Sequence, residues 1–358
     1  MSATPSTGPR LGLLVPCRNE AAVVARRLAN LAWCHWPDAV DPHRIVVVDD
    51  GSDDGTSDLA RAALAKHFDP DAPQPRVLGH VVPNDVRPGK AGAIAAGLGA
   101  LGDTVDVIVL TDADVILRQA ALLHVAAAFA GSPGPLMVCG SQEFVDTLGD
   151  DGLPVREDGS APRPAPGLYD RATAVVRAME SRRGLLFSVH GQLLAWSASL
   201  GLAPTPGLAA DDLDLMLSAR ARGARVEKLA NARFLEVKTP PGERAEAQAL
   251  RRARAYVQIV RKARWPAPRS AFEGLQLWCY RRLPLAAPWL AALAVALAAA
   301  WLAWFGNPLL LALGLAGLTL ALAVGPGRKL VQLLSVIGRA TAAERRQELG
   351  DRWEMPRA

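Results

Sequence analysis

Three acidic clusters carry the clearest chemistry in this chain, and each stands beside an apolar run. They are Asp49-Asp50 after Ile45–Val48, Asp112-Ala113-Asp114 after Val107–Leu110, and Asp211-Asp212 at the head of Asp211–Leu215. Aliphatic four-residue runs are typical of buried parallel strands, whose carboxyl ends border the crevice where open α/β sheets bind ligands. Carboxylates gathered there repel one another, so they suit a divalent cation and a polar substrate better than they stabilise a fold. The clusters predict an enzyme that acts on a phosphorylated ligand.

Strands and helices alternate through the N-terminal part of the chain. The predicted elements are the strand 11–15, a helix over 20–33, the strand 45–48, a helix capped by Thr56 or Ser57 that reaches His67, the strand 77–82, a helix over about 90–100 and the strand 107–110. This alternation predicts an α/β fold with a right-handed parallel sheet. Further predicted elements are a loop over 146–167, a helix over 168–184, a helix from Asp211 to near Gly223, a strand over 226–229 and a basic helix over 243–264.

Two apolar runs near the C-terminus predict a membrane anchor. Leu283–Phe305 carries no charge, and a second run follows over Pro308–Val324. At about 1.5 Å of rise per residue the first crosses a bilayer core of about 30 Å with tilt, and the second barely does. Arg281-Arg282 before the pair and Arg328-Lys329 after it place both ends in the cytosol. The alternative is a buried helical hairpin of a soluble domain.

Charge and cysteine usage narrow the possible partners. The net charge is +5, but residues 244–282 hold ten Lys or Arg against two Glu, so the rest of the chain is slightly acidic. A basic strip before a membrane span favours anionic lipids, and without a nucleic-acid-binding motif we expect no nucleic acid partner. The polar residues 1–10 lack the apolar core of a secretory signal, so the N-terminal region is expected in the cytosol. Four scattered cysteines indicate neither disulfides nor zinc.

Five motifs in order resemble the family 2 glycosyltransferases, which have the GT-A fold. They are Val15–Glu20, Val48–Ser52, Gly89–Ala93, Thr111–Asp114 and Asp211–Leu215. With the apolar C-terminal hairpin, the match is to the membrane-anchored, polysaccharide-synthase-like branch (cellulose, chitin, hyaluronan and poly-N-acetylglucosamine synthases), over roughly Leu13–Arg282. The resemblance implies a GT-A catalytic domain, a two-helix transmembrane hairpin and transfer of a sugar from a nucleotide diphosphate.

The resemblance assigns metal and donor contact to Asp112 and Asp114. Alternate residues at a strand end can present oxygen ligands to Mg²⁺ or Mn²⁺ that bridges the two phosphates of the donor. Two carboxylates alone bind Mg²⁺ weakly, so the metal is expected to arrive with the nucleotide. The alternative is that one or both act as helix caps or loop hydrogen-bond acceptors.

The residues near the first two motifs are expected to bind the nucleotide. Asp49 resembles the residue that contacts uracil, because a carboxylate can accept from the ring N–H, with Asp50 and Glu20 nearby and Pro16 shaping the base pocket. Asp50 can instead begin a turn, and Glu20 can favour a helix N-terminus. Lys90, in a Gly-flanked turn at a helix start, suits phosphate, with a solvated surface lysine as the alternative.

Asp212 is the predicted general base. It resembles the second acid of the family's Glu/Asp-Asp motif, with Asp211 as the first, and would take the proton of an acceptor hydroxyl in a single inverting displacement. The charge of Asp211 and partial burial can raise its pKa toward neutrality. Asp214 is expected to face solvent. The alternative for Asp212 is a helix N-cap.

Two further segments are weaker candidates. The Gln-x-x-Arg-Trp motif of the family is degenerate here, since Arg252 replaces the tryptophan, which leaves Arg251, Arg252 and Arg254 as candidates for diphosphate binding or as lipid-facing charges. The missing tryptophan weakens any case for processive chain extension. His190, Gly191 and Gln192 resemble the acceptor-side turn, although a histidine beside apolar residues is more often structural.

These features predict an inverting, metal-dependent glycosyltransferase that moves a sugar from a UDP-sugar to a lipid, lipid-linked glycan or polysaccharide. Alternatives are a non-catalytic, nucleotide-sugar-binding regulatory subunit, and a pyrophosphorylase, for which the loop after the first strand lacks the expected Gly-rich sequence. Two spans are too few to line a polymer channel, so partner subunits or a homo-oligomer are possible partners. The predicted divisions are a disordered N-terminus (1–10), a cytosolic GT-A domain (11–242), basic juxtamembrane helices (243–282), two transmembrane helices (283–327) and a cytosolic amphipathic tail (328–358).

Overall fold

The computed structural model describes residues 8–69, 71–73, 75–145, 168–237, 243–304, 314 and 325–345. The chain forms two compact units. One comprises Met1–Thr239 with Arg264–Pro266 and Asp351–Ala358, and the other Pro240–Ala263 with Ala267–Gly350. The predicted loop over 146–167 and residues 1–7 of the predicted disordered N-terminus (1–10) lie outside the described residues. No observation tests the predicted domain boundaries.

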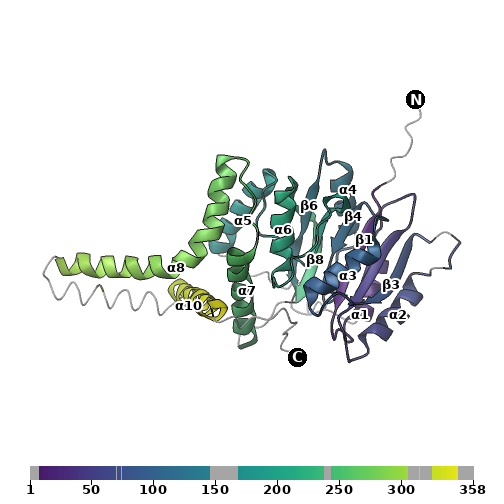
Figure 1. Ribbon diagram of the computed structural model, residues 1–358, viewed down its shortest axis with the longest axis horizontal. Helices are drawn as coiled ribbons and strands as arrows, with labels where there is room; N and C mark the ends of the chain where they lie inside the picture. Colours follow the sequence, from purple (N-terminus) through teal and green to yellow (C-terminus); the bar gives the residue numbers. More distant parts are fainter. Residues whose placement is uncertain are drawn as a thin grey trace, which may run out of the picture. The chain divides into compact units, whose positions relative to one another are not determined.

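An eight-stranded sheet with flanking helices forms the first unit (Figure 1). The strands, in the order that they take across the sheet, are β3 (Val77–Pro83), β2 (His43–Asp49), β1 (Leu11–Cys17), β4 (Val107–Leu110), β7 (Leu194–Ser197), β6 (Leu136–Val145), β8 (Arg225–Val237) and β5 (Ile116–Leu117). The helices are α1 (Val24–Trp33), α2 (Thr56–His67), α3 (Lys90–Leu101), α4 (Ala121–Ala130), α5 (Leu168–Arg182), the 3₁₀ turn η1 (Ala198–Leu200) and α6 (Asp211–Ala221).

The first four strands across the sheet are parallel, as the alternation predicts, and so are β6 and β8. Strand β7 runs antiparallel between β4 and β6, and β5 pairs antiparallel with β8. The fold is therefore α/β with a mostly parallel sheet. Because β1, β2 and β4 run in the same direction, the acidic clusters that follow β2 and β4 lie on the same side, at the carboxyl ends of these strands.

The period-two alternation of β1 divides the core between the two faces of the sheet. Leu11, Leu13 and Val15 pack in one cluster with side chains of α1, α2 and α4. Leu14 faces the other way, and a Cβ added to Gly97 of α3 would lie 2.8 Å from it. The close approach of α3 to the sheet therefore depends on a residue without a side chain.

Several predicted boundaries are wrong in detail. β1 extends through Pro16 to Cys17, because the missing proline N–H faces the side where pairing with β4 has already stopped at Leu14. α1 begins at Val24 rather than residue 20. Neither Thr56 nor Ser57 caps α2, since the capping position is Gly55 with a φ of 86° and no side-chain cap.

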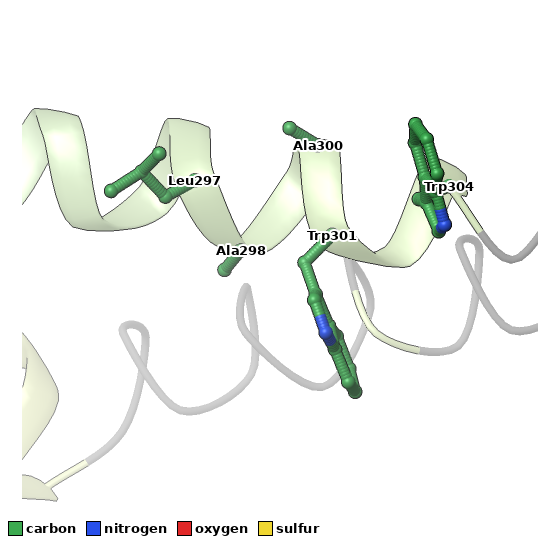
Figure 2. Close-up of a pocket in the computed structure, with 5 residues that line it drawn as sticks. All are labelled: Leu297, Ala298, Ala300, Trp301 and Trp304. Atoms are coloured by element: carbon green, nitrogen blue, oxygen red, sulfur yellow. The ribbon is translucent and has the colours of Figure 1, made fainter.

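The second unit is helical. It contains α7 (Glu243–Lys262), which confirms the predicted basic helix, α8 (Ala271–Trp304) and α10 (Gly325–Arg345). Ala271–Trp301 is long and apolar enough to cross a membrane, and none of its most apolar 18-residue window is buried. Figure 2 shows that Leu297, Trp301 and Trp304 of α8 line an apolar surface pocket. Of the predicted second span, 308–324, the described residues include only residue 314.

Candidate active site

Lys90, the first residue of α3, connects two of the acidic clusters. Its ammonium donates to Asp112 Oδ1 at 2.7 Å and lies 3.7 Å from Asp211 Oδ2, an ion-pair distance too long for a hydrogen bond. The backbone of Gly191 also lies beside it, since a Cβ at Gly191 would be 3.6 Å from both Lys90 Nζ and Asp212 Cβ. Segments that are about 120 residues apart in sequence thus meet around one cation. The solvated-lysine alternative does not describe this half-buried, paired side chain.

The Asp112–Asp114 turn follows β4 directly. Thr111 N still donates to Leu14 O, so the turn leaves the sheet only after that bond. Asp112 is half-buried and Asp114 is exposed. Enclosure among neighbouring atoms raises the pKa of Asp114, and the negative charge of Asp112 adds to the shift, although solvent screens part of it at an exposed side chain. Both carboxylates lie just after β4, and their part in binding a cation stays a prediction.

Asp211 and Asp212 are the first two residues of α6. Burial raises the pKa of both; for Asp212, the charge of Asp211 adds to the shift while Lys90 opposes it, leaving a value of about 6. Asp212 Oδ1 accepts the Leu213 N–H at 2.8 Å, which is a local bond, while the N-cap position belongs to Ala210 and has no side-chain cap. The N-cap alternative for Asp212 is therefore not supported, and its role as a base stays a prediction.

Asp214 does not face solvent, so that expectation is wrong. Its carboxylate is buried and accepts the backbone N–H of Thr205 at 2.6 Å and its hydroxyl at 3.1 Å. Asp214 stands two residues after Asp212 in the first turn of α6, and its carboxylate contacts Thr205 in the segment that precedes the helix. Asp214 thereby ties down the approach to Asp211 and Asp212.

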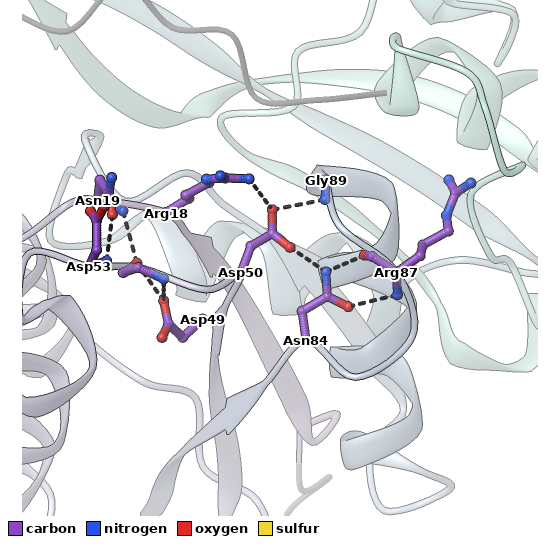
Figure 3. Close-up of polar contacts among 9 residues, drawn as sticks. Arg18, Asn19, Asp49, Asp50, Asp53, Asn84, Arg87 and Gly89 are labelled. Carbon is purple, nitrogen blue, oxygen red and sulfur yellow. Dashed lines mark hydrogen bonds and ion pairs between the residues drawn. The ribbon is translucent and has the colours of Figure 1, made fainter. Parts of the chain in front are cut away.

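Asp49 and Asp50 at the end of β2 have different partners (Figure 3). Asp49 Oδ1 accepts the N–H and hydroxyl of Ser52, and Oδ2 accepts the Ser57 hydroxyl at 2.8 Å. Asp50 accepts the Gly89 N–H at 2.8 Å, where a φ of 106° requires glycine, and pairs with Arg18 at 3.5 Å. Asp50 therefore holds the start of α3, which places Lys90, rather than only beginning a turn.

Asn84 completes this support. Its amide donates to Asp50 Oδ1 at 2.5 Å and to the carbonyl of Arg87, and its own Oδ1 accepts the Arg87 N–H at 3.3 Å. The turn from β3 into α3 is thus bound to the end of β2. Neither Asn84 nor Arg18 was predicted, because their contacts join turns whose relative position the sequence does not specify.

Glu20 lies within electrostatic range of the Asp112–Asp114 turn. Its N–H donates to Thr56 Oγ1 at 2.8 Å, and Asn19 before it adopts a left-handed φ of 56°. Burial raises the pKa of Glu20 to about 7, with the charges of Asp114 and Asp112 adding to the shift. The charges of the proposed metal ligands therefore act on the Glu20 carboxylate. Pro16 lies just before it, near the end of β1.

The acceptor-side candidates have contacts within the protein. His190 Nε2 lies 2.8 Å from an Arg177 guanidinium nitrogen, and its ring meets Phe234 edge-on at 6.3 Å. The Gln192 amide donates to Glu236 at 3.4 Å. These contacts favour the structural interpretation of His190, whereas Gly191 lies directly beside Asp212.

The three candidate arginines, Arg251, Arg252 and Arg254, lie on α7 in the second unit. Arg251 and Arg252 are exposed and Arg254 is half-buried. Their part in diphosphate binding stays a prediction.

The site offers groups of both charges, which suit a nucleotide diphosphate bound together with a cation. Lys90 and the N–H groups at the start of α3 offer positive potential for phosphate, and the carboxylates opposite offer oxygen ligands. Within the described ranges no group of three or more His, Cys, Asp or Glu side chains is arranged to hold a metal ion. The two carboxylates Asp112 and Asp114 therefore fit a cation whose other ligands are phosphate oxygens and water.

Comparisons with known proteins identify the family of this chain. The family profile described as "Glycosyltransferase like family 2" matches residues 9–265. The chain therefore belongs to family 2 of the glycosyltransferases, and this confirms the predicted family. The synthase-like branch stays a prediction. No curated protein sequence matches the chain.

Solved structures support the fold. A mannosyltransferase from Pyrobaculum calidifontis, solved with GDP-mannose and Mn²⁺, is 24% identical with a TM-score of 0.69, and the match covers 97% of this chain and 90% of that one. Glucosyl-3-phosphoglycerate synthase from Mycobacterium tuberculosis, solved with phosphoglyceric acid, is 17% identical with a TM-score of 0.46, over 73% and 82% of the two chains. The first likeness and the family match confirm the predicted GT-A fold.

Proposed function

We propose that this glycosyltransferase moves a sugar, with inversion, from a UDP-sugar to a lipid, lipid-linked glycan or polysaccharide at the cytoplasmic face of the membrane, as a member of the synthase-like branch. The observation that carries the proposal is Lys90, which stands between Asp112 and the Asp211-Asp212 pair. A donor diphosphate bound beside Lys90 would have the metal-ligand pair on one side and the proposed base on the other. Transfer of a sugar needs both.

A divalent cation, Mg²⁺ or Mn²⁺, would be held by Asp112 and Asp114. It would neutralise charge on the departing diphosphate. In the protein alone, Lys90 neutralises Asp112, and on donor binding its ammonium would be shared with the phosphates. Glu20, with its raised pKa beside the acid pair, adds negative charge that a bound cation would compensate.

Asp212 would act as the base. The acceptor hydroxyl oxygen forms a bond to the anomeric carbon while the bond from that carbon to the diphosphate oxygen breaks, and the hydroxyl proton passes to Asp212 Oδ2. The other oxygen, Oδ1, is already an acceptor for Leu213 N–H, which orients the carboxylate. Gly191 lies beside this carboxylate, since a Cβ there would be 4.0 Å from Asp212 Oδ2.

The choice of UDP rests on Asp49. Both Asp49 oxygens accept hydrogen bonds from Ser52 and Ser57, so reading uracil requires one of them to accept the ring N–H as well. A carboxylate oxygen has two lone pairs, which permits this. The mannosyltransferase of the same fold was solved with GDP-mannose, so guanine donors belong in the test.

The membrane site is supported by α8. None of its most apolar 18-residue stretch is buried, and its apolar segment follows the basic residues Arg281 and Arg282. A lipid-linked acceptor would then reach the enzyme from the bilayer surface. Partner subunits or a homo-oligomer would be needed if the product is a polymer to be exported.

Donor hydrolysis tests the proposal. Detergent-solubilised protein should hydrolyse one UDP-sugar of a panel of UDP- and GDP-sugars faster than the others, and only with Mn²⁺ or Mg²⁺. Turnover of a GDP-sugar instead would overturn the assignment of Asp49. Tight UDP binding without turnover of any donor would favour a regulatory, non-catalytic subunit.

A further inference from the structure

Arg27 is a buried arginine beneath the Asp112–Asp114 turn. It lies on α1, on the helix face that carries Val24, Leu28 and Leu31, and its side chain has no exposed surface. Burial removes the hydration of the guanidinium and lowers its pKa to about 10, with the charges of Asp112 and Asp114 opposing the shift. A buried charge is costly unless hydrogen bonds and opposite charge compensate it. The partners of Arg27 therefore show what the charge is used for.

The hydrogen bonds of Arg27 hold both ends of the turn. One terminal nitrogen donates to Thr111 Oγ1 at 2.5 Å, immediately before Asp112. The other donates to the carbonyl of Val115, immediately after Asp114, at 2.9 Å, and to Asn30 Oδ1 at the same distance. The two ends of a five-residue segment that carries both proposed metal ligands are thus fixed to one planar group.

Asn30, one turn further along α1, extends the same support. Its amide donates to the carbonyl of Leu117 at 2.9 Å, and its Oδ1 accepts the Leu117 N–H at 2.9 Å. Leu117 belongs to β5, the strand that follows the turn. α1 therefore holds the chain from Thr111 to Leu117 in one conformation, independently of any bound ligand.

Thr111 joins Arg27 to the segment around Gly191, which is the predicted acceptor-side turn. Its hydroxyl accepts from Arg27 and donates its only proton to the carbonyl of Gln192 at 2.8 Å. Gln192 follows Gly191, whose backbone lies beside Asp212 and Lys90. One chain of hydrogen bonds thus joins the proposed metal-binding turn to the segment beside the proposed base.

No carboxylate forms an ion pair with Arg27 among the described residues, and its Nε has no hydrogen-bond partner there. A guanidinium needed only to fill the core would be expected to have a buried carboxylate partner. Among the groups whose negative charge would raise the pKa of Arg27, Cys34 comes first, but burial raises the pKa of that thiol to about 11, so it is neutral near pH 7. The charges of Asp112 and Asp114 come next. The positive charge is therefore directed at the turn.

We propose that Arg27 is a positioning residue: through Thr111 and Val115 it fixes the Asp112–Asp114 turn in the conformation that binds the donor's divalent cation. Through Thr111 it also fixes the position of that turn relative to the Gly191 segment. This inference rests on the proposed function. It adds a role for two residues, Arg27 and Thr111, that do not touch donor or acceptor.

The test measures metal dependence rather than turnover. UDP binding to the detergent-solubilised full chain is titrated with Mn²⁺, and the concentration for half-maximal binding is compared between variants. Arg27→Met and Thr111→Val should each raise it, about 10-fold or more for Arg27→Met, in line with the loss of a group that orients metal ligands. Thr111→Ser keeps the hydroxyl and should stay within about twofold of the wild type. In metal-free protein, amide exchange of 111–117 and 190–194 should become faster in both damaging variants.

Arg220→Met is the matched control. Arg220 is another buried arginine, with 1% exposure, but it lies in the last turn of α6. This variant should lose stability without a change in the Mn²⁺ titration. If Arg27→Met fails to fold, the Mn²⁺ titrations of Thr111→Val and Thr111→Ser test the inference in its place.

Unchanged Mn²⁺ dependence in Arg27→Met and Thr111→Val, with the wild type showing metal-dependent UDP binding, would overturn this inference alone. A wild type without metal-dependent nucleotide binding would overturn the proposed function and this inference with it. Equal shifts in Arg220→Met would reduce Arg27 to a core-packing role.

Discussion

At the scale of single residues, Lys90 sets the charge state of its surroundings. Three carboxylates, Asp112, Asp211 and Asp212, act on one ammonium, and this raises the pKa of Lys90 above its usual range despite burial. The lysine therefore stays charged at any physiological pH. In return its charge limits how far burial raises the pKa of Asp212. A proposed base is thus held near neutrality, where a carboxylate is ionised yet still basic enough to take a proton.

Replacing Asp212 by asparagine should abolish transfer and leave nucleotide binding intact. The amide keeps the shape but cannot accept the hydroxyl proton, so kcat should fall by about 10²–10⁴-fold. UDP affinity, measured by calorimetry with Mn²⁺, should change by no more than about twofold, because the diphosphate contacts are assigned to Lys90, Asp112 and Asp114. A parallel loss of affinity would mean that Asp212 belongs to the donor site.

The pH dependence should follow the pKa of Asp212. Since this pKa is raised to about 6, the carboxylate is protonated and inactive below that pH, and kcat/KM should rise as the pH passes through about 6. Lys90→Gln removes the charge that lowers the pKa of Asp212, so the acid limb should move to higher pH. An acid limb near pH 4 in the wild type would contradict the environment described for Asp212.

The sequence predicted the residues of this site better than their contacts. Asp112, Asp114 and Asp211 are recognisable because each stands at the end of a strand or the start of a helix. Asp214 was misjudged because its orientation depends on the turn around Thr205, far from any periodic pattern. Arg27 stands on the apolar face of an amphipathic helix, and a charged residue at such a position is the one signal that could have found it.

At the scale of elements, two glycines of α3 differ in the space around them: Gly92 is crowded by the preceding turn and Gly99 is not. A Cβ at Gly92 would lie 1.9 Å from the carbonyl oxygen of Arg87, so the turn that carries Lys90 can approach the helix only over a glycine. A Cβ at Gly99, on the same helix, meets nothing within 4 Å. The two positions offer the same chemical change with opposite expected effects.

Gly92→Ala should therefore destabilise the protein by about 2–3 kcal/mol through overpacking, and should weaken UDP binding because the Lys90 turn must move. Gly99→Ala should stabilise it by about 0.5–1 kcal/mol, since alanine favours an exposed helix position over glycine. Thermal unfolding and UDP titration of both variants check this. Similar behaviour of the two variants would show that the turn adapts freely.

The elements themselves were predictable where a period was strong. The aliphatic runs of β2 and β4 and the apolar spacing of α1 identify those elements. β4 has the predicted ends, β2 begins two residues earlier and ends one later, and α1 begins four residues later than predicted. β6 and most of β8 were missed, because β8 mixes charged residues through a 13-residue strand that pairs with neighbours on both sides. Antiparallel β7 was not foreseen because its direction depends on the connection through α5, which the sequence pattern does not specify.

At the scale of the whole molecule, the chain combines a donor-binding unit with an apolar helix. From Leu283 to Trp304, α8 is about 33 Å long at about 1.5 Å per residue, which matches a bilayer core of about 30 Å. Arg281 and Arg282 stand at one end of this stretch, and the exposed Trp301 and Trp304 stand at the other, where interfacial tryptophans are common. α8 is therefore long and apolar enough for one crossing.

The location of the C-terminus distinguishes one crossing from two. Arg328 and Lys329 follow the second apolar run, so the positive-inside rule predicts that the chain returns to the cytosol. Green fluorescent protein fused after Ala358 should then fluoresce in bacteria and sediment with membranes, whereas alkaline phosphatase fused there should be inactive.

Replacing Leu293 and Leu297 by arginine should release the fusion from membranes, because each arginine costs about 3 kcal/mol near the bilayer centre. The control Val40→Arg, at an exposed position in the first unit, should not release it. Active phosphatase would mean a single crossing, and an unfused wild type recovered without detergent would remove the membrane from the proposed function altogether.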